Sequence, residues 1–235
     1  MRTSLRLNIA AVLAALMFLV STSVSGAQTH EEKRVTDSAA VLETLVRAPD
    51  QGIPEHILER AEAIVVIPSL VKGGFIIGAQ HGRGIMSIRD RETNRWSAPG
   101  FVALTGGSIG WQIGVQAVDL VLLVMNRDGV KDLLDNEFKF GANASVAAGP
   151  VGRQGEASTD ASLNAQILAY SRAKGLFAGL SLEGASLRVD KDANRDFYGT
   201  TISTEDMVRG ITKTTPAGSQ WTATLTRLVP ANSTR

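Results

Sequence analysis

The first apolar pattern of the chain is helical. Thr29 and Glu32 have the spacing of a capping box, in which each side chain accepts a hydrogen bond from the other residue's backbone N–H. The apolar residues that follow recur every three or four positions and would line one face: Val35, Ala39, Leu42 and Val46. The pattern predicts an amphipathic helix that ends within the Pro- and Gly-containing segment 48–52.

A short helix and a buried strand are expected next. Pro54 suits the first turn of a helix, which we expect to run to Ala61. Residues 64–67 (IVVI) form a compact β-branched run, typical of a buried strand.

From Gly73 to Val189 the period changes to two, which is typical of strands. Trp111, Ile113 and Val115 alternate with glutamine and glycine, and residues 118–125 have the size of a buried strand. A short helix is expected at 130–135, and the alternation over 176–189 is long enough to bend or to form a hairpin. Two tail helices are expected, one capped by Thr204 and one begun by Thr215 and Pro216 ahead of Trp221, Leu225 and Leu228.

Glycine determines the predicted shape of the sheet. The chain has 23 glycines, and many of them fall inside the expected strands. Isolated strand glycines suit sharp bends, bulges and close backbone approach. We therefore predict an α+β fold: a strongly curved, glycine-rich antiparallel sheet or small closed barrel, with flanking N- and C-terminal helices.

The N-terminus has the features of a signal peptide. Arg2 and Arg6 precede an apolar stretch at 9–20, which is short for a membrane span, and Ser25-Gly26-Ala27 offers small residues for cleavage. We predict a signal peptide over residues 1–27, cleavage after Ala27 and a periplasmic or secreted product. The alternative is an uncleaved N-terminal anchor; a lipoprotein anchor would need a cysteine, which the chain lacks.

Composition narrows the class of the product. Residues 28–235 have the length of a single domain, and without cysteine they form no disulfide. Removal of residues 1–27 takes away two arginines and no acid, so the net charge changes from +1 to −1. This balance does not predict binding to nucleic acid, which favours a clear basic excess.

One motif resembles that of an enzyme. Residues 106–110 (GGSIG) match the G-x-S-x-G turn that presents a nucleophilic serine, here Ser108. That motif needs a strand-to-helix turn and a later histidine, yet strand-like sequence follows it and all three histidines precede it. We interpret the segment as a glycine turn between strands and expect no catalytic residue.

Metal and phosphate motifs are equally weak. The acidic spacing of Asp190, Asp192, Asn194 and Asp196 is similar to that of a calcium loop, but Arg195 replaces its glycine and Thr201 its glutamate. A solvated hairpin loop is the favoured interpretation, with cation binding left open. We expect no metal site and no cofactor.

Several motifs along the middle of the chain resemble the SYLF domain, a lipid-binding, Ysc84-like family. They extend from about Thr36 to Gly199: KGGF at 72–75, GRG at 82–84, WSAP at 96–99, GWQIG at 110–114, DLV at 119–121 with MN at 125–126, GPVGR at 149–153, YSRAKGLFAG at 170–179 and YG at 198–199. The chain is identified as an exported bacterial member. The resemblance implies lipid binding and no established catalytic residues. In eukaryotic members it implies phosphoinositides and actin-linked roles. This chain departs from those members in its predicted signal peptide and in having no SH3 or FYVE domain.

The candidate site follows from what an anionic membrane requires. A phosphate headgroup favours convergent Arg and Lys, and the interface favours Trp and Tyr beside them. The candidate headgroup-binding residues are Lys72, Arg83, Arg95, Lys139, Arg153, Arg172 and Lys174. The candidate interface aromatics are Trp96 and Tyr170. The alternative for any one of the cations is a solvated charge at a strand end.

We therefore predict a non-catalytic, exported protein that associates peripherally with anionic phospholipid membranes. One alternative is a soluble carrier that encloses a hydrophobic ligand with Trp111, Ile113, Phe177 and Leu180. Another is an envelope structural or assembly protein that pairs through a sheet edge. The sequence neither requires nor indicates a homo-oligomer.

Overall fold

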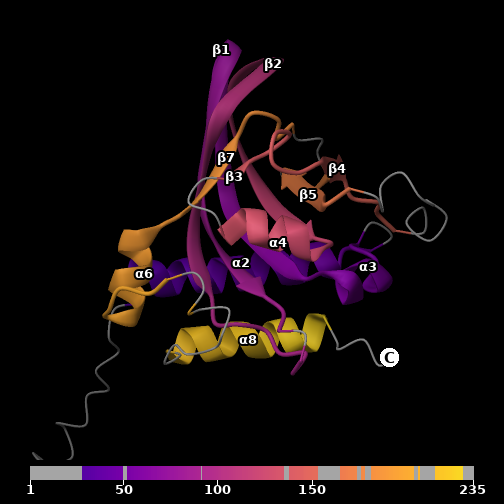
Figure 1. The fold of residues 1–235 in the computed structure, drawn as a ribbon. Helices are drawn as coiled ribbons and strands as arrows, with labels where there is room; N and C mark the ends of the chain where they lie inside the picture. The colour runs from indigo at the N-terminus through magenta and orange to yellow at the C-terminus, as the bar shows by residue number, and fades with distance from the viewer. Residues whose placement is uncertain are drawn as a thin grey trace, which may run out of the picture.

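The computed structural model describes residues 28–49, 52–90, 92–134, 138–152, 165–173, 176–177, 181–203, 206 and 215–229. A strongly curled seven-stranded sheet is flanked by N- and C-terminal helices (Figure 1). The elements follow in the order α2 (His30–Val46), α3 (Glu55–Arg60), β1 (Ala63–Ile88), β2 (Gly100–Val124), α4 (Arg127–Leu134), β3 (Phe138–Lys139), β4 (Val146–Ala148), β5 (Ile167–Ala173), β6 (Leu176–Phe177), β7 (Ser186–Val189), α6 (Lys191–Tyr198) and α8 (Pro216–Leu228). The predicted α+β fold class is confirmed.

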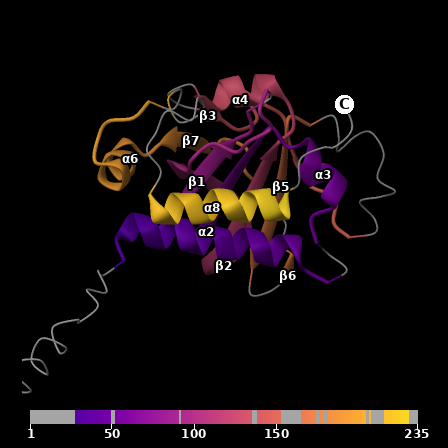
Figure 2. The same ribbon diagram turned by 90° about the horizontal axis from the view of Figure 1, so that it is seen from below.

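The two long helices begin where their sequences predict. Thr29 and Glu32 form the complete capping box of α2. Thr215 accepts a hydrogen bond from the backbone of Gly218 and so caps α8. The two helices lie side by side under the sheet (Figure 2), and Trp221 of α8 donates from its indole nitrogen to Ser87 Oγ of β1 at 2.8 Å. This bond satisfies the one polar group that a buried tryptophan carries.

β1 and β2 form one antiparallel ribbon that curls back on itself. The ribbon is closed by the loop 89–99, with register shifts between Ile67 and Leu70 and between Gly74 and Ile76. The backbone N–H of Arg89, just after β1, donates to the carbonyl of Glu62, just before it, at 2.8 Å. The two ends of a 26-residue strand are thus hydrogen-bonded to each other.

Glycine permits the tightest contact within this curl. A Cβ on Gly82 would lie 2.6 Å from Ile67 Cγ2, and one on Gly84 would overlap the carbonyl oxygen of Val66. The second half of β1 therefore packs directly on the first half, at a distance that only a residue without a side chain allows. The predicted role of strand glycines in close backbone approach is confirmed at these two positions.

Side chains alternate between two cores because successive strand residues point to opposite faces. The helix-covered core lies between the sheet and the helices and includes Ile64, Val66, Phe101, Val121, Leu168, Tyr170, Leu42 and Trp221. The inner core lies within the curl and includes Val65, Ile67, Leu104, Leu122, Phe138, and Val130 and Leu133 of α4. Burial on both faces explains the continuous apolar run at 64–67.

The strand order is β3-β7-β2-β5-β4, with β1 paired to β2 and β6 paired to β5. β4 pairs with β5 in parallel, so the expectation of a wholly antiparallel sheet is wrong at this edge. β2 pairs with β7 through residues 102–105 and with β5 through residues 119–124. The stretch of β2 between these two segments pairs with β1 alone. We call this stretch, residues 70–80 of β1 and 106–118 of β2, the arm; it projects beyond the other strands (Figure 1).

Three local predictions need correction. Residues 106–110 lie within β2 and make no turn between strands, since they pair with β1. The segment 176–189 was expected to bend or to form a hairpin, but β6 pairs with β5 while β7 pairs with β2 and β3. Residues 191–198 form the helix α6 in place of a hairpin loop.

Other predictions concern residues outside the described ranges: the signal peptide at 1–27 and the helix capped by Thr204. Among the helices that the structure describes, none combines the length and the apolar character needed to span a bilayer.

Candidate functional site

The second half of β1, the first part of β2, β7 and β3 present an exposed sheet face. Arg83 pairs with Ala103, and Ala103 pairs with Arg188 on its other side. Residues directly opposite each other in antiparallel strands point to the same face. Arg83 and Arg188 are both exposed, and they flank the small side chain of Ala103.

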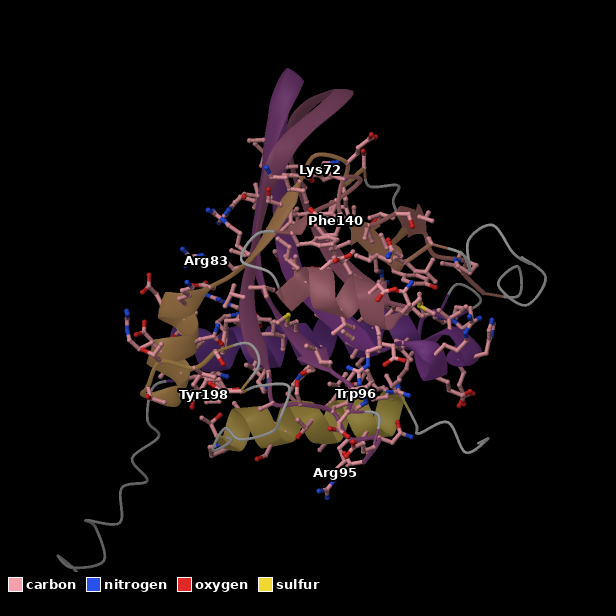
Figure 3. The ribbon with its side chains drawn as sticks, in the orientation of Figure 1. Lys72, Arg83, Arg95, Trp96, Phe140 and Tyr198 are labelled. Atoms are coloured by element: carbon pink, nitrogen blue, oxygen red, sulfur yellow. The ribbon has the colours of Figure 1, made fainter. Side chains whose placement is uncertain are left out.

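A second row lies two residues nearer the arm. It runs across four strands as His81, Thr105, Ser186 and Lys139. Its two end members, His81 and Lys139, are exposed. We call His81, Arg83, Lys139 and Arg188 together the basic face; Figure 3 shows Arg83 directed away from the body of the molecule.

The inner core determines which way these cations point. Val102, Leu104 and Leu187 occupy the intervening strand positions, and all three are buried in the inner core. A slip of one residue in register would exchange the two sets, burying charges and exposing apolar groups. The packing of the curl therefore holds the basic face outward.

The cations of the basic face have no acidic partners in the described part of the chain. Arg83, Lys139 and Arg188 make no ion pair there. The carboxylates that follow Arg188 are occupied elsewhere: Asp190 pairs with Arg34 at 3.0 Å and Asp192 with Arg195 at 2.8 Å. Since strands lie about 5 Å apart, Arg83 and Arg188 start about 10 Å apart, within reach of one anionic group between them.

The predicted cations are otherwise dispersed. Only Arg83 and Lys139 meet on the basic face. Lys72 lies on the arm, and Arg95 lies beyond α8 at the opposite end of the molecule (Figure 3). Arg172 is half-buried in β5 opposite Asp119. Arg153 and Lys174 lie outside the described residues. The expectation that these side chains gather in one patch is therefore wrong for Arg95.

The two predicted interface aromatics are buried. Trp96 is 8% exposed and lies under the guanidinium of Arg89, 4.6 Å from its ring centroid. Tyr170 is 1% exposed, packs against Gly149, and has its pKa raised by burial. Neither ring is placed as an interfacial side chain must be. Basic neighbours in sequence suggested exposure, but both rings belong to the helix-covered core.

Sequence reasoning missed two members of the basic face. Arg188 lies between apolar residues in a short strand, and only the pairing of β7 with β2 shows what it faces. His81 lies inside β1, and only its pairing with Thr105 of β2 shows that it belongs to this face. The alternation of apolar and polar residues around His81 and Arg188 indicates that both side chains face outward. It does not indicate which strands lie next to them.

The acidic spacing after β7 belongs to a helix. Asp190 caps α6 by accepting from the backbone of Ala193, and Asn194 is buried against the backbone of Phe101. The described residues contain no cluster of acidic or histidine side chains fit to hold a metal ion. The resemblance to a calcium loop therefore does not extend to the structure.

Comparison with known proteins shows which family this chain is similar to. Residues 105–228 match the family model "Ysc84: Las17-binding protein actin regulator". The chain is 35% identical to "Protein YSC84" of Saccharomyces cerevisiae over 188 residues, which cover 77% of this chain and 40% of that protein. It is 36% identical to "LAS seventeen-binding protein 3" of the same species over 171 residues, 72% of this chain and 37% of that protein.

A human protein is similar as well. The chain is 35% identical to "SH3 domain-containing YSC84-like protein 1" of Homo sapiens over 166 residues, 70% of this chain and 48% of that protein. The chain thus spans less than half the length of these curated relatives. The name of one of these relatives describes a binding protein, and the family description names an actin regulator. The predicted bacterial source stays a prediction.

Proposed function

Because the chain belongs to the Ysc84 family of Las17-binding protein actin regulators, we propose a binding function for it: the basic face associates with the surface of anionic phospholipid membranes. The observation that carries the proposal is the set of exposed cations on one sheet face without acidic partners in the described part of the chain. The resemblance of the sequence to lipid-binding SYLF domains supports the same function.

The strength of such binding follows from the charge. Each Lys or Arg near an anionic surface contributes about 1 kcal/mol. Arg83, Lys139 and Arg188 would together contribute about 3 kcal/mol, which corresponds to weak, reversible and salt-sensitive association. An arginine can also bind a phosphate oxygen pair with two parallel hydrogen bonds. The small side chain of Ala103 leaves room for a headgroup between Arg83 and Arg188.

The membrane in question depends on the predicted export. If residues 1–27 are removed as a signal peptide, the domain acts in the periplasm or outside the cell. Phosphatidylglycerol and cardiolipin are then the anionic lipids proposed as targets.

The described structure gives no comparable support to the carrier alternative. α4 places Val130 and Leu133 inside the curl, where they pack in the inner core. The residues predicted to enclose a ligand, Trp111, Ile113, Phe177 and Leu180, have side chains outside the described set.

Vesicle co-sedimentation tests the proposal. The protein would begin at Gln28, which retains every described element. We expect binding to vesicles of phosphatidylcholine and phosphatidylglycerol, weaker binding at high salt, and none to phosphatidylcholine alone.

Paired substitutions locate the surface. Arg83→Gln with Arg188→Gln should cost about 2 kcal/mol, or about thirtyfold in affinity. The matched control, Arg60→Gln with Arg95→Gln, removes two exposed cations from other positions and should leave binding nearly unchanged. Equal losses in the two double variants would refute the assignment of binding to the basic face.

A further inference from the structure

We infer that the arm inserts exposed apolar side chains into the interfacial layer of the same anionic membrane. This inference rests on the proposed function and deepens it. Val71 is 46% exposed and Val115 is 80% exposed, and they are the two exposed large apolar side chains among those whose burial the structure describes, a set that leaves out residues 74–77 and 108–114. Both belong to the arm.

Strand register places these side chains together. Val71 pairs with Ala117, and Gly73 pairs with Val115. Val71 and Val115 therefore lie diagonally across one face of the two-stranded ribbon. A Cβ on Gly73 would lie 3.6 Å from Val115 Cγ2, so Val115 extends over a residue that has no side chain to cover it.

The charge around the arm favours an anionic lipid surface as its occupant. β1 contains Lys72, His81 and Arg83 and no acidic residue, and β2 contains no acidic residue before Asp119. A second copy of the chain would bring like charges together, whereas an anionic bilayer brings opposite ones. Exposed apolar residues flanked by cations are typical of segments that lie in a membrane interface.

The arm is continuous with the basic face. Gln80 pairs with Gly106 at the base of the arm, and the next pair is His81 with Thr105 of the basic face. The same two strands thus lead from the cations to the exposed valines. Electrostatic attraction would bring the protein to the surface, and burial of the valines would retain it there.

A single fluorescent label tests the insertion. The chain has no cysteine, so Val115→Cys offers one site for an environment-sensitive nitrobenzoxadiazole dye. With vesicles of phosphatidylcholine and phosphatidylglycerol we expect a blue shift and quenching by nitroxide-labelled lipid. The matched control is Ala223→Cys on the exposed side of α8, where the same dye should remain in water.

Co-sedimentation of the same samples separates the two proposals. Sedimentation with vesicles but no spectral shift at position 115 would overturn the insertion and leave membrane binding in place. Failure to sediment would overturn both. A shift that is present without vesicles, with dimers in analytical ultracentrifugation, would assign the valines to a second copy of the chain and overturn the insertion.

A substitution without any label completes the test. Val71→Ser with Val115→Ser removes apolar surface from exposed positions, so the fold should be retained. We expect affinity for the mixed vesicles to fall about tenfold, while its salt dependence stays unchanged because no charge is lost. Unchanged affinity would overturn the insertion. Ala223→Ser is the control.

Discussion

Two regions of the molecule hold their cations in opposite ways. Between the helices and the sheet, Arg34 of α2 pairs with Asp190 at 3.0 Å and lies over the ring of Phe101. On the open face, Arg83 and Arg188 are exposed and have no acidic partner in the described residues. The difference teaches that a positive side chain in this chain is structural where partners surround it and available for binding where they are missing.

Arg89 extends the comparison. Its guanidinium donates to the carbonyl oxygen of Glu59 in the last turn of α3 at 2.8 Å, and it lies over the ring of Trp96 at 4.6 Å. Burial lowers the pKa of Arg89, while attraction to Glu62 and Glu59 acts in the opposite direction. A cation at the carboxyl end of a helix is favoured by the helix dipole. Arg89 therefore joins α3 to the sheet and is not available to a ligand.

Alkaline conditions should produce the largest effect, and only in the helix-covered region. The chain has two tyrosines, Tyr170 and Tyr198, and burial raises the pKa of both above the ordinary value of 10.0. Their contribution to stability is complete below pH 10, where the unfolded chain also keeps them protonated, and it is lost as the pH rises above that value. We expect phenolate absorbance to appear only together with loss of the circular dichroism of the fold.

Tyr170→Phe sharpens this test. The Tyr170 hydroxyl is buried without a hydrogen-bond partner in the described structure, so its removal should not weaken the fold at neutral pH. The variant should unfold at a higher pH than the parent. Phenolate absorbance that develops fully near pH 10 while the circular dichroism stays native would show that neither ring is held by the core.

Removal of single arginines compares the two regions directly. Arg34→Met keeps much of the aliphatic packing but leaves Asp190, whose side chain is 15% exposed, without its partner. Loss of one member of a buried ion pair costs about 3 kcal/mol. Arg188→Met, on the open face, should change the free energy of unfolding by less than about 0.5 kcal/mol. Urea denaturation followed by circular dichroism measures both, and equal losses would contradict the division into structural and available cations.

The sequence predicts local features of the structure well and long-range pairings poorly. The capping box at Thr29 and the Thr215 cap are encoded within four residues, and both appear in the structure. The basic face depends on pairings between residues far apart, such as Ala103 with Arg188, which no local pattern specifies. Trp96 was misjudged for the same reason. Its burial depends on where the helices pack, and its sequence neighbours do not report that.

Glycine substitutions should change the free energy of unfolding by less than Arg34→Met does. The change should be large in the packed curl and small in the exposed arm. Gly84 lies where the ribbon packs on itself, and a Cβ there would overlap the Val66 carbonyl and lie 2.9 Å from Ile67 Cα. Both obstacles are backbone atoms, which cannot rotate away as a side chain does. Gly84→Ala should therefore cost about 2 kcal/mol. Gly107, in the arm, has nothing within 4 Å of its added Cβ, so Gly107→Ala should stay within about 0.5 kcal/mol of the parent.

Together, the two alanine substitutions distinguish close backbone approach from strand flexibility as the reason for glycine at these positions. If glycine served only to keep the strands flexible, both substitutions would have similar effects on the free energy of unfolding. Close approach of backbones predicts a loss at Gly84 alone. Urea denaturation supplies the measurement. If Gly84→Ala were as stable as the parent, the curl could open by a few tenths of an ångström without loss of free energy of unfolding. The tight packing of β1 on itself would then not be what holds the basic face outward.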